Sequence, residues 1–247
     1  MASGMARGAA KRGKRIAFGD GTRIIWDHLS EQIFKGNPNI APLGSENSPD
    51  IEWINFYRGH RLYNRQEGHR WVYNYDFRAI PGEIFFDAAE RRFADTVKPG
   101  FVLIEPTVKQ SAPNKQWPKN LYFKLAKRLM RAGYDVRQPY YLNSYQMPGI
   151  TQLKTHSFRL ALAALSKASL YIGGEGGQHH GAAAVSIPAV VIFGGFTPTA
   201  LTGYPTHTNI DGGAVACGSI RPCEHCKAAM ENIGVDEVYD AAKKYLL

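Results

Sequence analysis

The stretch that decides the fold is Tyr171-Ile-Gly-Gly-Glu-Gly-Gly-Gln-His-His-Gly-Ala-Ala-Ala-Val-Ser-Ile-Pro-Ala-Val-Val-Ile-Phe-Gly194. Its pattern predicts a buried strand, a glycine-rich turn, a helix of small residues, a proline stop and a second buried strand. Glycines at the end of a strand let the backbone come close to a ligand. The following helix points its unsatisfied amides and its positive dipole end at the same place. The stretch therefore predicts a cradle for a diphosphate, with Glu175, His179 and His180 at its rim.

The surrounding sequence alternates apolar strands with amphipathic helices. The continuous apolar run Phe101–Glu105 is typical of a strand buried on both faces of a parallel sheet. Other expected elements are a helix after Pro118 closed by Gly133, a strand at 134–137, a helix capped by Ser157, strands at 169–172 and 189–193, and a closing helix from Val235. This order predicts a doubly wound α/β domain over residues 99–247, with its ligand beyond the carboxyl ends of the strands.

The first 98 residues are harder to interpret. Residues 14–21 are expected to form a strand and a glycine turn that carries Asp20, and residues 22–34 a helix. Strands are expected at 51–57 and 71–75. The arginines and aromatic residues of this region suit stacking on sugars or bases, or they cover a small core with amphipathic side chains. We expect a small α/β domain over residues 16–98.

Charge is concentrated at the N-terminus. The chain carries a net charge of +9, and residues 1–15 contain five basic residues and no acidic one. Such a basic arm is expected to be flexible, either as a solubilising tail or as an electrostatic tether to nucleic acid or anionic lipid headgroups. The remaining charge of the chain still suits an anionic substrate.

Three further features limit the class of protein. No apolar run approaches the roughly 20 residues needed to span a bilayer, and no apolar segment follows the basic N-terminus as in a secretory signal. The three cysteines cluster near the C-terminus and do not form a disulfide framework. We therefore expect a protein of the cytoplasm without a membrane span. A nicotinamide enzyme is disfavoured, because the glycine-rich stretch departs from the dinucleotide fingerprint at His179.

Several motifs together carry a family resemblance. Asn114-Lys-Gln-Trp-Pro118, the segment 174–184 with its downstream Ile187-Pro188 and Phe193-Gly194, and the turn Phe18-Gly-Asp-Gly21 resemble the ADP-heptose:lipopolysaccharide heptosyltransferases of glycosyltransferase family nine. Cys223-x-x-Cys226 and Val235-Asp-Glu-Val238 are also similar to the C-terminal pattern of that family. The resemblance is good over residues 101–247 and thin over 16–98.

The resemblance implies a GT-B-like α/β architecture, with two Rossmann-like domains facing a cleft and the N-terminal one reduced. It implies an inverting glycosyltransferase that moves a sugar, heptose among the candidates, from a nucleotide-diphosphate sugar to a hydroxyl of a saccharide or lipopolysaccharide. An ADP-sugar is the expected donor, and no metal or other cofactor is required. Asp20 corresponds to the general base. The residues expected to bind the donor are Thr107, Lys115, Gly174, Glu175, Gly176, Gly177, His179 and His180.

Some residues depart from the family pattern. His180 aligns with the family histidine, whereas Glu175 stands where the family usually has aspartate, which leaves the donor sugar open. The short first domain and the basic arm leave two alternatives: a glycosyltransferase acting on modified bases of viral DNA, and a non-catalytic protein that binds a nucleotide sugar or nucleic acid.

The cysteine cluster also allows two interpretations. Cys217, Cys223 and Cys226, with His225, offer enough ligands for zinc. Adjacent His225 and Cys226 point awkwardly for one ion, however, and the spacing is not that of a standard zinc finger. The alternatives are therefore a metal site at the three cysteines, or reduced thiols in a loop near the nucleotide.

Overall fold

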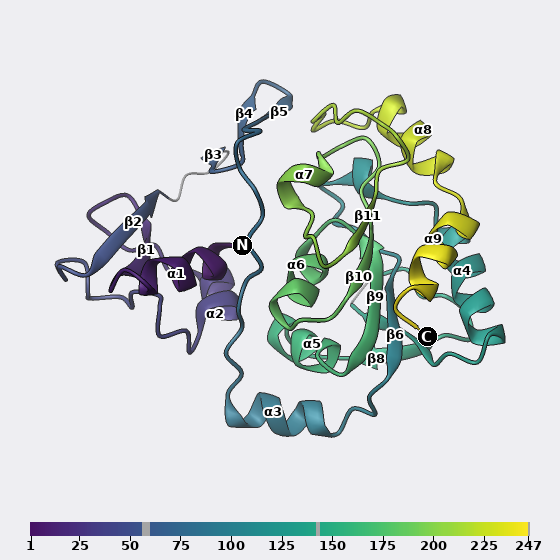
Figure 1. The fold of residues 1–247 in the computed structure, drawn as a ribbon, viewed down its shortest axis with the longest axis horizontal. Helices are drawn as coiled ribbons and strands as arrows, with labels where there is room; N and C mark the ends of the chain where they lie inside the picture. The colour runs from purple at the N-terminus through teal and green to yellow at the C-terminus, as the bar shows by residue number, and fades with distance from the viewer. Residues whose placement is uncertain (56–59, 142–143, 247) are drawn as a thin grey trace.

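A computed structural model describes residues 1–55, 60–141 and 144–246, and a six-stranded parallel sheet forms its centre (Figure 1). The strand order is β11-β10-β9-β6-β7-β8, and every neighbouring pair is parallel. The strands are β6 (Phe101–Glu105), β7 (Val136–Tyr140), β8 (Thr151–Lys154), β9 (Ala168–Gly174), β10 (Ala189–Ile192) and β11 (Thr208–Ile210). The chain order reverses between β6 and β9, and ligands bind at such a switch point in open α/β sheets.

Helices cover both faces of this sheet. On one face Val102, Ile104 and Ile172 pack against α4 (Lys119–Arg131) and α9 (Val235–Lys243). On the other face Leu103 and Tyr171 pack against α5 (Phe158–Leu165) and α6 (Gly177–Ala184). Figure 1 shows the two pairs of helices on opposite sides of the sheet. Successive side chains of a strand point to opposite faces, so the continuous apolar runs fill two cores.

The structure confirms the α/β class and most elements expected in this half of the chain. Ser157 caps α5 by accepting a hydrogen bond from the backbone N–H of Leu160. Gly133 ends α4 with a positive φ of 91°, the backbone region that favours glycine. Strand β8 was not expected, because only Leu153 of its four residues is apolar and buried.

The N-terminal part is built on a two-stranded parallel sheet. Strand β1 (Arg15–Gly19) pairs with β2 (Ile51–Asn55), and residues 56 and 57 of the expected strand lie outside the described residues. The helix predicted over 22–34 is shorter, because α2 (His28–Phe34) begins only after Asp27, whose side chain accepts from the Ser30 N–H. Before it, Ile24 forms a β-bridge with Gly19. An antiparallel sheet of β3 (His60–Arg61), β4 (Asn64–Glu67) and β5 (Arg70–Tyr73) follows.

The expectation of a flexible basic arm at residues 1–15 is wrong. Residues Ala2–Ala10 form helix α1, whose Ala6 and Ala9 are fully buried against the small N-terminal core. Side chains of alanine lose no rotamer freedom on burial, so an Ala/Gly-rich segment docks closely at little entropic cost. Three of the five basic side chains also form ion pairs. The ion pairs are Arg7–Glu83 at 3.1 Å, Arg12–Glu52 at 2.6 Å and Arg15–Asp50 at 2.5 Å. The arm therefore no longer argues for a nucleic-acid acceptor.

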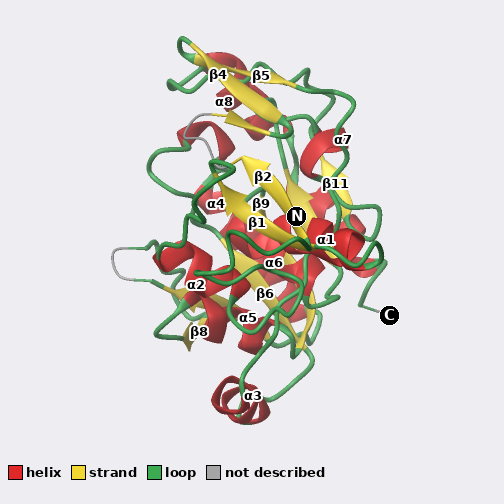
Figure 2. Cartoon of the chain, turned by 90° about the vertical axis from the view of Figure 1, so that its left-hand side faces the viewer, coloured by secondary structure: helices red, strands yellow, loops and turns green. Residues whose placement is uncertain are grey.

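A buried ion pair connects the N-terminal part to the large sheet. Arg159 in the first turn of α5 pairs with Glu90 of α3 (Ala88–Asp95), with its Nε 2.6 Å from a carboxylate oxygen. Its guanidinium also donates to the backbone carbonyls of Gln32 and Lys35, at and just beyond the end of α2. In Figure 2, α1, α2 and β1 lie in front of the layer that contains α5 and α6. Within the described ranges, no helix has both the length and the apolar character needed to cross a membrane.

Candidate active site

A cavity of about 820 Å³ opens at the carboxyl ends of β6 and β9. Most of the residues expected to bind a donor line it together: Thr107, Lys115, Gly174, Glu175, Gly176, Gly177 and His180. Thr107 follows β6, and Lys115 ends the short 3₁₀ helix η1 (Pro113–Lys115). The others lie between the last residue of β9 and the first turn of α6. The volume lies within the range of cavities that bind small ligands and cofactors.

A buried carboxylate organises the floor of this cavity. The side chain of Glu175 is 6% exposed, and it accepts a hydrogen bond from the Lys115 ammonium on one oxygen. Its other oxygen lies 3.4 Å from His180 Nε2. Burial by itself would raise the pKa of Glu175, but the charges of Lys115 and His180 hold it well below its ordinary value. The cavity thus contains a cation, an anion and an imidazole in direct contact.

The start of α6 adds backbone donors to the same place. Gly176 is the N-cap and has no side chain to accept from the first-turn amides, which therefore stay available to a ligand. Two other glycines leave room for neighbouring side chains. A Cβ on Gly181 would lie 2.1 Å from a methyl of Leu162 in α5, and one on Gly173 would lie 2.3 Å from the Tyr171 hydroxyl. Glycine at Gly181 lets α6 lie tightly against α5, whereas glycine at Gly173 leaves room for the Tyr171 side chain of the same strand.

Several buried polar atoms in the cavity wall have no hydrogen-bond partner among the described residues. They are Asn64 Oδ1, Thr107 Oγ1, Gln178 Oε1 and Thr202 Oγ1. Buried polar atoms are nearly always paired in folded proteins, because an unmade hydrogen bond is costly. These four atoms lie in the wall of the cavity, and a polar ligand that reaches them would supply the missing partners.

Sequence reasoning missed a second carboxyl group in the cavity, that of Glu105 at the end of β6. One of its oxygens accepts a hydrogen bond from the Tyr171 hydroxyl at 2.7 Å. Burial raises the pKa of Glu105 to about 7, although the hydrogen bond from Tyr171 works in the opposite direction. The signal that could have revealed it is an acidic residue that directly follows four apolar residues of a buried strand.

The antiparallel sheet of β3–β5 supplies the opposite wall. Arg61, Tyr63 and Trp71 line the cavity, and the Arg61 guanidinium lies 5.6 Å from the centre of the Trp71 ring and 5.9 Å from that of Tyr63. Three of the Arg and aromatic residues of this region therefore face the candidate ligand, an arrangement suited to stacking on a base or a sugar. Arg58, another arginine of the region expected to stack on sugars or bases, lies outside the described residues.

His179 is placed differently from its neighbour His180. Its side chain is fully buried, and its ring contacts Phe193, Tyr204 and His207 with centroid distances between 5.1 and 5.8 Å. Burial, reinforced by the charge of His180, lowers the pKa of His179 well below its ordinary value. The expectation that His179 binds the donor is not met by this geometry, because it packs behind the cavity wall as a neutral ring.

Asp20 stands apart from the cavity-lining residues. It is exposed in the turn after β1, and its Oδ1 accepts from the Thr22 N–H, the Thr22 hydroxyl and the Arg23 N–H at 2.6 to 2.9 Å. Backbone hydrogen bonds from Arg23 and Thr22 lower its pKa to about 2. The carboxylate is therefore ionised at neutral pH, and its other oxygen is open to an incoming group.

Comparison with known proteins gives an independent result. The sequence profile of glycosyltransferase family 9 (heptosyltransferase) matches residues 66–233, more than half of the chain. None of the curated proteins matches. Among solved structures, a family 9 glycosyltransferase from Veillonella parvula is 16% identical, with a TM-score of 0.52, and the match covers 68% of this chain and 55% of that one.

A second solved structure has the same fold. It is the dodecameric, iron-containing heptosyltransferase TibC of enterotoxigenic E. coli in complex with ADP-D-β-D-heptose. It is 18% identical with a TM-score of 0.50, and the match covers 61% of this chain and 45% of TibC. These similarities confirm the GT-B-like α/β fold. The chain spans about half the length of the solved structures that it resembles.

Proposed function

Because the chain belongs to glycosyltransferase family 9, the family of the heptosyltransferases, we propose that its cavity binds a nucleotide-diphosphate sugar and that the protein transfers the sugar to a hydroxyl group. The acceptor class is a saccharide of the lipopolysaccharide type. ADP-heptose is the donor to test first. The part of the chain that matches the family, residues 66–233, contains every cavity residue expected to bind the donor.

One observation carries this proposal. Lys115, the uncapped start of α6 and the unpaired Thr107 hydroxyl converge on one cavity at the carboxyl edge of a parallel sheet. Together they offer an ammonium group, backbone amides and a hydroxyl, the groups that bind a diphosphate. A hydrophobic ligand would leave the amides and the hydroxyl unpaired and would not use the remaining N–H donors of Lys115.

The same groups suit the chemistry of transfer. When the bond between the anomeric carbon and the diphosphate oxygen breaks, negative charge builds on the leaving diphosphate, and fixed positive groups stabilise it. Lys115 has three N–H donors and uses one on Glu175, so the others remain for phosphate oxygens. We therefore propose transfer without a metal ion, with His180 as a further donor to the diphosphate. Glu175 is placed to accept a hydrogen bond from a ribose or sugar hydroxyl.

Asp20 remains our proposal for the general base that deprotonates the acceptor hydroxyl. Attack by that hydroxyl on the face opposite the diphosphate inverts the anomeric centre. The turn fixes the carboxylate through Oδ1 and keeps Oδ2 for the acceptor. A pKa of about 2 keeps Asp20 charged at neutral pH but makes it a weak base. Because Asp20 does not line the cavity, we further propose that the N-terminal part closes over the donor before transfer.

Two substitutions at this position test the assignment. Asp20→Asn keeps an oxygen that accepts the hydrogen bonds of the turn, but its amide cannot take up the proton of the acceptor hydroxyl. Asp20→Ala loses the turn hydrogen bonds as well as the base. We expect both variants to lose sugar transfer by at least about 100-fold, the lower end of what a general base contributes. Donor binding, measured by calorimetry with ADP-heptose, should remain within about twofold of the wild type.

The outcomes separate the alternatives. Full transfer activity in Asp20→Asn would remove Asp20 from the mechanism. Tight donor binding by the wild-type protein, with neither transfer nor donor hydrolysis, would identify a non-catalytic nucleotide-sugar-binding protein. Absence of binding to every nucleotide sugar tested would contradict the proposed function itself.

A further inference from the structure

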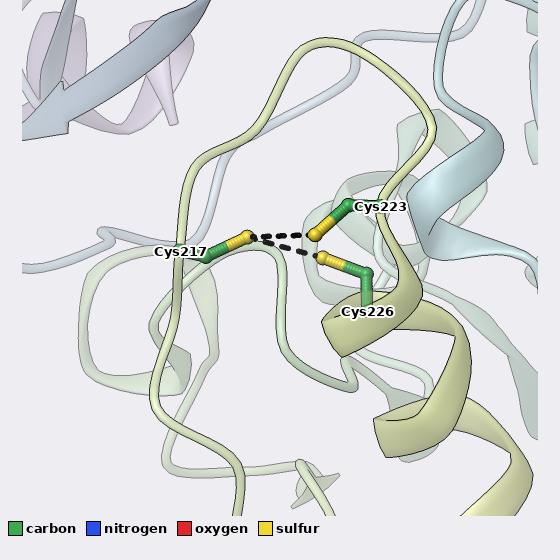
Figure 3. A group of neighbouring side chains, drawn as sticks. All are labelled: Cys217, Cys223 and Cys226. Atoms are coloured by element: carbon green, nitrogen blue, oxygen red, sulfur yellow. Dashed lines mark hydrogen bonds between the residues drawn. The ribbon is translucent and has the colours of Figure 1, made fainter.

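Three cysteine side chains converge outside the proposed donor cavity. Cys217 lies in the loop after β11, Cys223 is the N-cap of α8 (Glu224–Asn232), and Cys226 lies in the first turn of that helix. Figure 3 shows the three sulfur atoms pointing toward one another from the two segments. Cys217 Sγ lies 3.9 Å from Cys223 Sγ and 3.2 Å from Cys226 Sγ, and all three lie within 4.8 Å of one another. All three cysteines are free thiols.

These distances are those of a thiolate metal site. Zinc binds sulfur at about 2.3 Å in a tetrahedral arrangement, which places neighbouring sulfur atoms about 3.8 Å apart. The observed separations lie on either side of this value. A metal ion at the centre of the group would therefore need only small side-chain movements, and Cys226 is already fully buried there.

The backbone around Cys217 and Cys223 favours negative charge on their sulfurs, whereas Cys226 Sγ lies 3.4 Å from the Gly195 carbonyl oxygen. The Ser219 N–H donates to Cys217 Sγ at 3.4 Å, and Cys223 sits at the positive end of α8. His225 takes no part, because its Nε2 is 2.8 Å from the Val215 carbonyl oxygen and its ring is exposed. Within the described residues, the protein supplies three sulfur ligands and leaves the fourth position open.

We propose that Cys217, Cys223 and Cys226 bind one thiophilic divalent metal ion, with Zn²⁺ preferred and the fourth ligand supplied by solvent. Thiolate ligands select zinc over magnesium and calcium, which prefer oxygen. The site is separate from the proposed donor cavity, since no cysteine of the described chain lines that cavity.

The position of the site in the fold gives the metal a structural role. The loop that carries Cys217 is a junction: Gly218 N–H donates to the Phe196 carbonyl, and the Gly218 carbonyl accepts from the Trp71 N–H at 2.9 Å. Phe196 and Trp71 both line the donor cavity. Fixing this loop against α8 therefore fixes the wall formed by the antiparallel sheet.

A second connection leads to Lys115. The neighbouring side chain of Asn114 is buried and donates to the carbonyls of Ser219 and Arg221, while its oxygen accepts from the Cys223 N–H at 3.0 Å. The metal ion would thus stabilise the segment that positions the Lys115 ammonium. It would do so without contacting the donor.

The test measures metal binding directly and needs no activity. The reduced full-length protein is titrated with Co²⁺ and Zn²⁺, and bound metal is measured by elemental analysis after desalting. We expect one ion per chain, a thiolate-to-cobalt charge-transfer band, and displacement of Co²⁺ by Zn²⁺. Cys217→Ser, Cys223→Ser and Cys226→Ser should each lose the band, whereas the matched control His225→Ala should keep it.

Each remaining outcome has a stated meaning. Absence of bound metal in the reduced wild-type protein, or retention of the full band in all three serine variants, would overturn the proposal. A mass lower by two hydrogens with no metal uptake would identify a disulfide pair instead. Circular dichroism of each variant shows whether it folds, and chelation of the wild-type protein provides a second route: we expect a lower thermal midpoint after metal removal, restored by Zn²⁺.

Discussion

The chain contains the pattern Gly-acid-Gly twice, each time at the end of a parallel strand. Gly19-Asp20-Gly21 follows β1, and Gly174-Glu175-Gly176 lies at the end of β9. In the first, the carboxylate is exposed and its hydrogen bonds come from its own turn. In the second, the carboxylate is buried, and its partners are Lys115 from a distant segment and His180 from the first turn of the following helix α6.

The difference shows how surroundings assign chemistry to one local pattern. Local turn amides hold the pKa of Asp20 at about 2. Burial raises the pKa of Glu175, but the charges of Lys115 and His180 outweigh burial and lower it. An exposed carboxylate fixed by its own turn can face an acceptor that diffuses in. A buried carboxylate held by a lysine instead keeps that lysine in position for the donor.

The largest expected effect tests the buried partner of Glu175. Lys115→Met leaves a buried carboxylate without its main counter-charge, which should lower the free energy of unfolding by about 3 kcal/mol. Donor binding should fall by at least about tenfold, because the ammonium group proposed for the diphosphate is lost. Chemical denaturation and calorimetry with ADP-heptose measure the two effects.

The double variant Lys115→Met/Glu175→Gln separates them. Neutralising the buried carboxylate should recover most of the lost stability, whereas donor binding should remain weak because no cation has been restored. Stability unchanged in the single variant would show that Glu175 does not depend on Lys115. Wild-type donor affinity in the folded double variant would show that Lys115 does not contact the donor.

An intermediate effect comes from adding one methyl group to each turn. A Cβ on Gly176 meets no protein atom within 4 Å, and its φ of 172° is accessible to alanine. Gly176→Ala should therefore fold normally but project a methyl group into the diphosphate cradle and weaken donor binding by about tenfold. Gly21 has a φ of 95°, so Gly21→Ala should cost about 1 kcal/mol of stability and leave donor binding unchanged.

The two alanine variants serve as controls for each other. Each adds the same group to a glycine beside an acidic residue, and thermal unfolding and calorimetry are measured on both. The opposite result would be a stable Gly21→Ala variant with impaired donor binding and a Gly176→Ala variant with normal donor binding. It would place the donor at the turn that carries Asp20 and not at the start of α6.

Much of the six-stranded sheet and its covering helices could be predicted from the sequence, since the signals of these elements are local. The apolar runs of β6, β9 and β10 predict strands buried on both faces. Ser157 marks the start of α5, because its hydroxyl accepts a hydrogen bond from the N–H three residues later. Helix α1 could not be predicted in the same way. Its Ala and Gly residues carry weak periodicity, and its stability comes from burial of Ala6 and Ala9 on β1.

The candidate site could also be predicted only where its signals are local in sequence. The spacing of the glycines located the turn and the backbone N–H donors at the start of α6. The sequence around Glu175 does not, however, indicate that its partner is Lys115, 60 residues away. The burial of His179 and the partial burial of His180 also depend on another segment: Tyr204 contacts both rings, and His207 contacts that of His179. Which of two adjacent histidines faces a ligand is decided by tertiary packing, and the sequence pattern treats them alike.

The smallest expected effect concerns Glu105, a third acidic residue at a strand end. Its folded pKa of about 7 exceeds the roughly 4.3 of an unfolded glutamate. The folded state therefore binds the proton more tightly, and this group lowers stability as pH rises from about 4 to 7.

Above pH 7 the ionised carboxylate of Glu105 also faces the cavity, so ADP-heptose binding should weaken roughly threefold between pH 6 and 8 through screened repulsion of the diphosphate. Glu105→Gln should bind the donor with an affinity that no longer changes across this range, as measured by calorimetry in buffers of matched ionic strength. If donor binding by Glu105→Gln still depends on pH, another group causes that dependence. Glu175, with Lys115 and His180, would then be the carboxylate that decides the charge of the site.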